Sequence, residues 1–249
     1  MRAEIPAARF AAGGEDPYAR MLDGGSDGVL RLRRVSSGAI AEEWDFVALS
    51  APADGDDLAV LGGCDGPLLD VGCGPGRMVR AAAQRASAAM GIDVSAAAVR
   101  RARADGTPAL ERSIFDRLPL EGRWRTVLLM DGNVGIGGDP RRLLERCRDL
   151  LAPGGVLIAE GAADPDLDEQ SLFTVVDAAG AESAAFPWAR AGWRVLMAAA
   201  TAAGLADATH VRSGARHFVR AVAVAPRPIS TALTATANAA DHRPTRTSG

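Results

Sequence analysis

The chain has 249 residues with a formal net charge of −3, and 48% of its residues are hydrophobic and 24% charged. This length suits one domain of ordinary size, or one domain with an appendage. The sequence has no run of about 18 apolar residues, and its basic residues are scattered over a slightly acidic chain, so neither a membrane span nor a nucleic-acid groove is indicated. Residues 1–25 show no signal-peptide pattern, and we expect a cytoplasmic protein.

The cysteines give no sign of a disulfide framework or a metal centre. Cys64, Cys73 and Cys147 are odd in number, widely spaced and match no C-x-x-C pair. We interpret them as small apolar core residues and expect no metal site.

Between residues 68 and 224, short apolar runs alternate with amphipathic stretches. This alternation predicts an α/β fold in which strands and helices take turns around a parallel sheet. Residues 68–71 and 90–94 read as buried strands, and helices are expected at 76–88 and from Ser95 to about residue 104, with Ser95 as the N-cap.

The second half of this region continues the pattern. Residues 126–130 form an apolar strand, and Asp139 followed by Pro140 predicts a helix start, with the helix running through Leu151. Pro153, Gly154 and Gly155 are expected to end that helix before the next strand. The remaining elements expected are a strand at 156–160, a helix at 191–203, and an antiparallel pair of strands at 208–212 and 217–224.

Two regions lie outside this α/β pattern. Residues 1–66 contain a hairpin pattern at 29–35 and 43–49 that is too small to form its own core, so we expect an N-terminal appendage or lid beside the main domain at 67–224. Residues 225–249 are rich in Pro, Thr, Ala, Ser and Arg without apolar periodicity, which predicts a disordered tail.

A glycine-rich turn connects the first predicted strand of the domain to its helix. Gly72 permits a tight turn, Gly74 removes a side chain where a ligand approaches the backbone, and Gly76 lets the helix begin close to the sheet. The free N–H groups at such a helix start attract an anion, so a small zwitterion or a nucleotide fits there. The alternative is a plain strand–turn–helix connection that uses glycine only for its geometry.

An acidic residue ends the second strand at the position where a ribose is often held. Asp93 follows Gly72 by 21 residues, and its carboxylate can accept both ribose hydroxyl protons, which predicts an adenosine derivative as ligand. Helix capping is the alternative, although Ser95 can supply the cap. A dinucleotide fingerprint would require a third glycine at position 77, where the chain has Arg77, so a pyrophosphate ligand is disfavoured.

Three motifs occur in an order and spacing typical of one enzyme family. Residues 69–76 (LDVGCGPG), residues 91–95 (GIDVS) and residues 151–157 (LAPGGVL) together resemble the class I S-adenosylmethionine-dependent methyltransferase family, over residues 67–224. This resemblance implies a Rossmann-like, doubly wound, seven-stranded sheet that is mostly parallel with an antiparallel last strand. It also implies S-adenosyl-L-methionine as the cofactor and a small molecule as the partner.

The resemblance also implies roles for individual residues. Asp70 would order the loop and face the methionine amine, the turn glycines would pass beside the methionyl part, and Asp93 would hold the ribose. The family's acid for the adenine amine would fall at Ser113 or Ile114, so Asp116, or the backbone of Ile114 and Phe115, is the expected substitute. The cofactor-binding set is Asp70, Gly72, Cys73, Gly74, Gly76, Asp93, Val94, Ile114, Phe115 and Asp116.

The chemistry itself places few demands on the protein. Methyl transfer from a sulfonium is an in-line displacement that needs positioning, and it needs a base only when the acceptor is protonated. The loop at residues 131–139 follows a central strand, and we predict Asp131 as acceptor for the cofactor amine or as base, and Asn133 as a substrate hydrogen-bond partner. In the alternative, both side chains only stabilise a glycine-rich turn.

Aromatic residues outside these motifs suggest a substrate wall. Phe186 and Trp188, with Arg190 on an expected loop, would suit a planar or carboxylated small molecule, unless they only pack in the core. Trp44 and Phe46 either line the same cavity or dock the hairpin.

The activity indicated is methyl transfer to an oxygen or nitrogen nucleophile of a small molecule. A catalytically silent module that binds an adenosine ligand is the first alternative, since cofactor motifs report binding and not turnover. An NAD(P)-dependent oxidoreductase is the second; it is disfavoured by Arg77 and by the absence of any Tyr-x-x-x-Lys pair, because the chain has no lysine.

Overall fold

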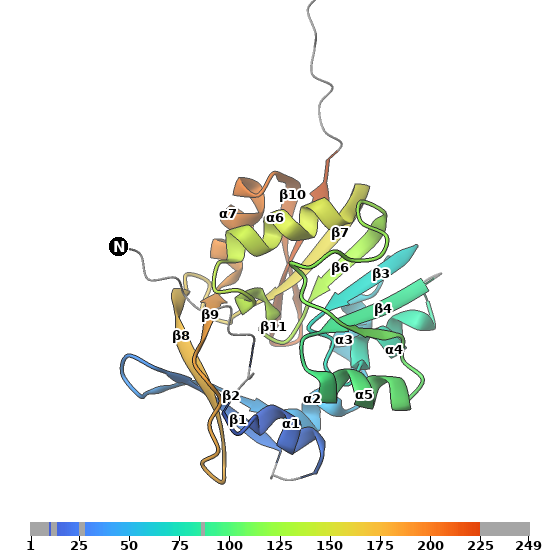
Figure 1. Ribbon diagram of the computed structural model, residues 1–249. Helices are drawn as coiled ribbons and strands as arrows, with labels where there is room; N and C mark the ends of the chain where they lie inside the picture. The colour runs from blue at the N-terminus through green and yellow to red at the C-terminus, as the bar shows by residue number, and fades with distance from the viewer. Residues whose placement is uncertain (1–9, 11–13, 25–27, 86–87, 225–249) are drawn as a thin grey trace, which may run out of the picture.

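The computed structural model describes residue 10 and residues 14–24, 28–85 and 88–224, and within them the chain forms two β-sheets with helices packed around the larger one (Figure 1). The tail expected at 225–249 lies outside the described residues. None of the helices in these ranges is long and apolar enough to cross a membrane.

The larger sheet has seven strands in the order β10-β11-β7-β6-β3-β4-β5. The strands from β5 to β7 pair in parallel, whereas β11 is antiparallel to both of its neighbours. The prediction of a mostly parallel seven-stranded sheet with an antiparallel last strand is therefore confirmed. The strands are β3 (Pro67–Val71), β4 (Ala88–Asp93), β5 (Ala109–Glu111), β6 (Trp124–Leu129), β7 (Leu151–Gly161), β10 (Leu205–Ser213) and β11 (Arg216–Ala223).

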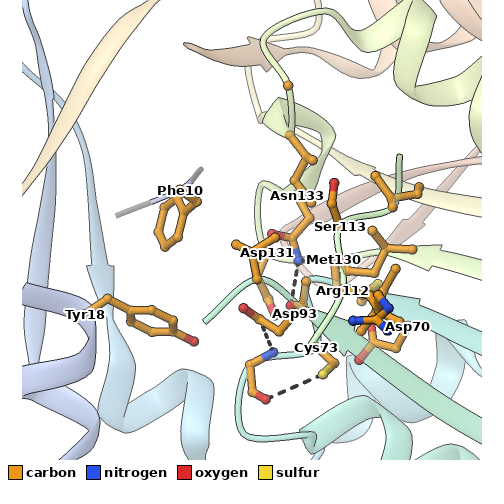
Figure 2. A pocket seen from close by; sticks show the side chains of 18 of the residues that line it. Phe10, Tyr18, Asp70, Cys73, Asp93, Arg112, Ser113, Met130, Asp131 and Asn133 are labelled. Carbon is orange, nitrogen blue, oxygen red and sulfur yellow. Dashed lines mark hydrogen bonds between the residues drawn. The ribbon is translucent and has the colours of Figure 1, made fainter. Parts of the chain in front are cut away.

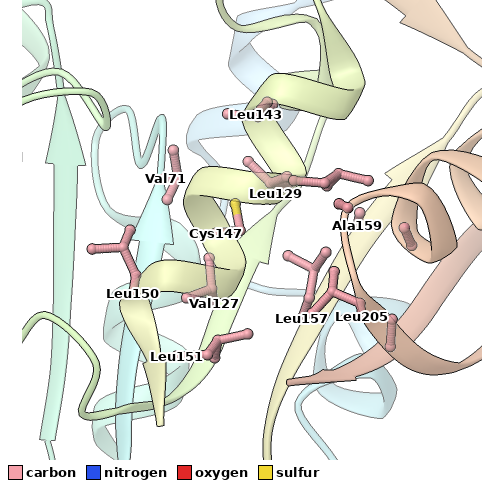
Figure 3. Packing of buried hydrophobic residues seen from close by; sticks show 14 of the residues in the cluster. Val71, Val127, Leu129, Leu143, Cys147, Leu150, Leu151, Leu157, Ala159 and Leu205 are labelled. Carbon is pink, nitrogen blue, oxygen red and sulfur yellow. The ribbon is translucent and has the colours of Figure 1, made fainter. Parts of the chain in front are cut away.

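Helices cover both faces of this sheet. The helices α6 (Pro140–Leu150) and α7 (Trp193–Ala202) pack on one face, and α3 (Gly55–Val60), α4 (Arg77–Ala83) and α5 (Ala96–Ala104) lie on the other. Figure 3 shows the first of these interfaces, where Cys147 and Leu150 of α6 lie over Val127 and Leu157 of the strands below. The sheet is thus buried on both sides, as the apolar runs in its strands require.

The two helix starts predicted from side-chain caps are confirmed. The hydroxyl of Ser95 accepts a hydrogen bond from the N–H of Ala98, and the carboxylate of Asp139 accepts one from the N–H of Arg142. Other boundaries differ from prediction: α4 ends at Ala83, and β7 begins immediately after α6, so that the Pro-Gly-Gly sequence lies within the strand. The register of β7 on β6 shifts between Trp124 and Thr126, where the strand accommodates this extra length.

A second sheet joins the N-terminal region to the middle of the chain. Its order is β2-β1-β8-β9, with β1 (Val29–Arg34), β2 (Ile40–Asp45), β8 (Asp168–Asp177) and β9 (Phe186–Ala191). A short helix, α1 (Pro17–Leu22), packs against β8 and against α5. The N-terminal strands therefore form their sheet with strands of residues 168–191, and not by themselves.

Two sequence-based expectations are wrong here. The second strand of the hairpin was expected at 43–49, but it ends at Asp45, whose carboxylate accepts from the N–H groups of Val47 and Ala48 and starts the short helix α2 (Phe46–Ser50). The segment with Phe186 and Arg190 was expected to be a loop, but it is β9, because it pairs along its whole length with β8.

The cap at Asp139 can be tested directly. We expect Asp139→Ala to lower the free energy of unfolding by about 1 kcal/mol, because the N–H of Arg142 loses its only side-chain acceptor at the start of α6. Urea denaturation would measure the change. Asp139→Ser should retain most of the stability, and equal losses in the two variants would contradict the capping role.

Candidate functional site

A cavity of about 560 Å³ lies where the carboxyl ends of β3, β4 and β6 meet the second sheet (Figure 2). Its size falls in the range of small-molecule sites, roughly 300–1,000 Å³. The predicted cofactor-binding and loop residues all line this cavity except Gly76, whereas Phe186 and Arg190, suggested for the substrate wall, do not. Gly76 instead forms the N-cap of α4, and a Cβ there would lie 2.6 Å from the side chain of Thr107.

The glycine turn exposes main chain to the cavity at one position. Gly72 and Gly74 have φ angles of 75° and 51°, in the left-handed region that favours glycine. A Cβ on Gly72 would lie 2.6 Å from the side chain of Asn133, so that face of the turn is covered. Among the described residues, a Cβ on Gly74 would meet only the hydroxyl of Tyr18, at 3.2 Å. The bare backbone available to a ligand is therefore that of Gly74.

The carboxylate of Asp93 connects this turn to the next helix. Its Oδ2 accepts from the N–H of Gly74 at 2.9 Å, and its Oδ1 accepts from the N–H of Ser95 at 2.8 Å. Burial raises the pKa of Asp93, and these backbone hydrogen bonds oppose that shift. Because each carboxylate oxygen has a second lone pair, Asp93 can order the turn and still accept hydrogen bonds from a ligand.

Asp70 lies at the floor of the cavity and is only 2% exposed as a residue. Burial, together with the nearby charges of Asp131 and Asp93 and against the opposing charge of Arg77, raises its pKa to about 7. A carboxyl in this state is half ionised near neutral pH, and a cationic ligand group beside it would favour the ionised form.

The loop after β6 is tied to the rest of the site by its polar side chains. Both carboxylate oxygens of Asp131 are ion-paired, Oδ2 with Arg77 at 2.6 Å and Oδ1 with Arg216 at 3.1 Å. The amide nitrogen of Asn133 donates to the carbonyl oxygens of Val71 and Gly72, at 3.0 Å each. The structure thus brings both predicted residues to the cavity and uses them to hold the loop against the glycine turn.

Asp131 belongs to a buried network that the sequence did not reveal. Arg216 binds both oxygens of Glu160, at 2.7 and 2.6 Å, and also contacts Asp57 at 2.7 Å. Asp57 is fully buried and pairs with Arg77 as well. Although burial opposes the ionisation of Asp57, the two arginines hold its pKa below the ordinary value.

At the other end of the cavity, residues 113–116 form a tight turn. The carboxylate of Asp116 accepts from the N–H of Ser113 at 3.0 Å, and the carbonyl of Ile114 accepts from Arg146 at 2.9 Å. The ring of Phe115 faces the cavity beneath the guanidinium of Arg142, 4.8 Å from the ring centroid. One oxygen of the Asp116 carboxylate is therefore engaged in a hydrogen bond within the turn.

Aromatic side chains close the cavity on the side of the second sheet, and we call the following residues the aromatic wall: Phe10, Tyr18, Trp44, Phe46 and Trp188. Trp44, Phe46 and Trp188 were suggested by the sequence as lining residues. Tyr18 was missed, because it lies outside any motif or periodic pattern; its being the chain's only tyrosine was the available signal. Figure 2 shows Phe10 and Tyr18 facing the Asp93 side of the cavity.

Arg190 does not serve as the free guanidinium that the sequence suggested. It pairs with Glu42 at 3.0 Å and with Glu169 at 3.1 Å, and it does not line the cavity. The physical reason is its place in β9, where the pairing with β8 brings Glu169 directly opposite Arg190.

Comparison with known proteins agrees with this geometry. Residues 68–155, which hold the glycine turn, Asp93 and the loop after β6, match a family model described as a methyltransferase domain. A search among curated proteins found no match.

Solved structures resemble a larger part of the chain. An S-adenosylmethionine-dependent methyltransferase from Bacteroides fragilis, in complex with S-adenosyl-L-homocysteine, is 19% identical with a TM-score of 0.69, covering 89% of this chain and 98% of that one. The sugar N-methyltransferase KedS8 from Streptoalloteichus is 20% identical with a TM-score of 0.51, covering 68% and 84%. The amino pentose methyltransferase CalS10 from Micromonospora echinaspora, bound to S-adenosylmethionine, is 21% identical with a TM-score of 0.51, covering 72% and 89%.

The structural likenesses establish the fold, and the family match falls on the segment that builds the glycine turn. They agree with the resemblance seen in the sequence motifs, and two of these neighbours are bound to S-adenosyl-L-homocysteine or S-adenosylmethionine. The chain has the Rossmann-like fold of these S-adenosylmethionine-dependent methyltransferases, and its residues 68–155 match a methyltransferase domain.

Proposed function

We propose that this enzyme transfers a methyl group to an oxygen or nitrogen nucleophile of a small molecule by in-line displacement. The observation that carries this proposal is a single cavity that joins the bare backbone at Gly74 and the Asp93 carboxylate to the aromatic wall. A cofactor site and an acceptor site that share one enclosed space satisfy the main demand of the reaction, which is alignment. Two of the structural neighbours are described as methyltransferases of sugars, which agrees with a small acceptor.

The described residues fit S-adenosylmethionine, which supplies an electrophilic methyl group when bound. We propose that the Asp70 carboxylate faces the methionine ammonium group, because it is an acid at the cavity floor without a side-chain hydrogen bond among the described residues. Asp93 would accept the ribose hydroxyls through its free lone pairs. The remaining proposed cofactor contacts are Gly72, Cys73, Gly74 and Gly76 for the methionyl part, Val94 for the ribose, and Ile114, Phe115 and Asp116 for the adenine.

We assign Asp131 and Asn133 to the reaction as residues that fix the loop after β6. Asp131 is held by two arginines and Asn133 by two carbonyl oxygens, so the loop has one position relative to the turn. A base is needed only for an acceptor that is protonated at the working pH. We further propose that residues 67–224 form the methyltransferase domain and that residues 1–66 act as its lid, with 225–249 as a separate tail.

The test of the function is turnover of methyl-labelled S-adenosylmethionine with panels of alcohols, phenols and amines, compared with Gly74→Val. We expect the wild type to label at least one acceptor, and we expect Gly74→Val to lose binding of S-adenosylhomocysteine because its side chain would enter the cavity. Gly106→Val is the matched control, since Gly106 also has a positive φ, of 75°, and open space around its Cβ, but does not line the cavity. Equal cofactor affinity in the two variants would contradict the proposed site.

Removing the Asp93 carboxylate should weaken cofactor binding selectively at the sugar. Each charge-assisted hydrogen bond lost in Asp93→Ala contributes about 1.5–3 kcal/mol before compensation by water. Calorimetry should show a large loss of affinity for S-adenosylhomocysteine and a much smaller one for its 2′,3′-dideoxy analogue. If the affinities for both ligands fell equally, Asp93 would act only through the turn at Gly74.

The pKa of Asp70 predicts a pH dependence of cofactor affinity. An ammonium group binds the ionised carboxylate, so protonation of Asp70 below its pKa of about 7 competes with binding. We expect affinity for S-adenosylhomocysteine to fall by about tenfold from pH 8 to pH 6. In Asp70→Asn, affinity should be lower at both pH values and change by less than about twofold between them. A wild-type affinity independent of pH would show that Asp70 does not face the ammonium group.

A further inference from the structure

The aromatic wall concentrates the chain's rings at one site. The chain has six Phe, four Trp and one Tyr, and six of these residues line the cavity when Phe115 is counted with the wall. The wall rings contact one another at ring-centroid distances from 4.9 to 6.4 Å, in tilted or edge-on geometry. Such an arrangement leaves ring faces and edges available to a flat apolar guest.

The wall adjoins the part of the site where a methyl group would be delivered. A Cβ on Gly132 would lie 3.9 Å from the indole nitrogen of Trp44, and a Cβ on Gly135 would clash with the ring of Trp188. The loop between them carries Asn133, which is bonded to Gly72 of the glycine turn. The glycines of this loop thus allow Trp44 and Trp188 to approach the cofactor turn closely.

The charges behind the wall compensate one another. Glu42 accepts from the indole nitrogen of Trp44 at 3.1 Å and from Arg190, and Glu169 accepts from Arg190 and Arg34. Two arginines and two glutamates are therefore paired among themselves, and none of the four lines the cavity. An anionic acceptor would therefore find no cationic partner among the wall residues; the arginines that line the cavity are Arg77, Arg112 and Arg142, outside the wall.

One polar group on the wall points into the cavity. The hydroxyl of Tyr18 lies near Gly74, and burial together with the charge of Asp93 raises its pKa, which keeps it a neutral hydrogen-bond partner. It can orient the hydroxyl or amino group of a guest without adding charge.

We propose that the aromatic wall binds a planar, uncharged acceptor, such as an aromatic ring bearing a hydroxyl or amino group. This proposal rests on the proposed function, because it names the substrate class of the same cavity. It replaces the carboxylated acceptor that a free Arg190 would have suited. The rings supply stacking area, and the heteroatom lies at the polar edge beside Tyr18 and the cofactor turn.

The test measures binding without turnover, using calorimetry on the full chain with and without saturating S-adenosylhomocysteine. The probes are 2-naphthol as the planar neutral ligand, 2-naphthoate as its anionic counterpart, and glucosamine as a polar, non-planar amine. We expect 2-naphthol to bind at least about tenfold more tightly than either of the other two. Tighter binding of 2-naphthoate or of glucosamine overturns the proposal.

Variants on β9 show whether the wall is the binding surface. Trp188→Leu should weaken 2-naphthol binding by about tenfold, whereas Trp188→Phe, which keeps an aromatic ring, should retain most of it. Phe186→Leu is the matched control, since Phe186 lies in the same cluster two residues earlier but does not line the cavity. Trp44→Leu repeats the measurement on β2, so that a folding defect at position 188 does not decide the result.

The outcomes separate this inference from the proposed function. Unchanged 2-naphthol affinity in both Trp188→Leu and Trp44→Leu overturns the wall as the binding surface. Wild-type protein that binds S-adenosylhomocysteine but not 2-naphthol overturns the inference and leaves methyl transfer standing. Wild-type protein that binds 2-naphthol at Trp188 but no S-adenosylhomocysteine supports the wall and overturns the proposed function.

Discussion

The site depends on a partly buried set of charges beneath the cavity. The set consists of five side chains from separate parts of the chain: Asp57, Arg77, Asp131, Glu160 and Arg216. The two arginines bind the three acids by hydrogen bonds and ion pairs. Removing such charges from water costs free energy that their attraction does not reliably return, so the network is poor evidence for stability. Its clear effect is geometric. It fixes the start of α4, the loop after β6 and the turn between β10 and β11 relative to one another, which is what an alignment-dependent reaction requires.

The same network explains the electrostatics of the cofactor end. Three of its members are acids and two are arginines, and the carboxyls of Asp70 and Asp93 lie close by. Burial, together with this excess of acid, raises the pKa of Asp70, and the acids favour cationic groups at the floor, which suits the proposed cofactor with its ammonium group and sulfonium. The arginines meanwhile occupy both oxygens of Asp131, so this carboxylate holds the loop in place and is a poor candidate to collect a proton from the acceptor.

Local sequence signals were sufficient for six of the seven strands of the larger sheet and for the glycine turn with Asp93, whereas the short edge strand β5 was not predicted. The caps at Ser95 and Asp139 are contacts between residues three apart, and the glycine turn with Asp93 lies within one β-α-β unit, so adjacent residues carry the information. The second sheet could not be predicted in this way. Its strands β1 and β8 pair residues such as Leu32 and Val175, which lie far apart in the chain, and neither strand shows by itself which partner it will meet. Arg190 was misjudged for the same reason, because its partner Glu169 is defined only by that pairing.

The two halves of the cavity differ in the same way, because one is built from residues close together in the sequence and the other from residues far apart. The half that we propose for the cofactor is built from motifs within residues 68–155, where the family match lies. The half with Tyr18, Trp44 and Trp188 is built by segments that the second sheet brings together from both sides of that match. In the function that we propose, sequence motifs therefore report the methyl donor, whereas the acceptor site depends on pairings between residues far apart in the chain. Because strands of the second sheet supply both Trp44 and Trp188, a shift of one residue in the register of β2 or β9 would turn an indole away from the cavity, and the acceptor site would change while every cofactor motif remained intact.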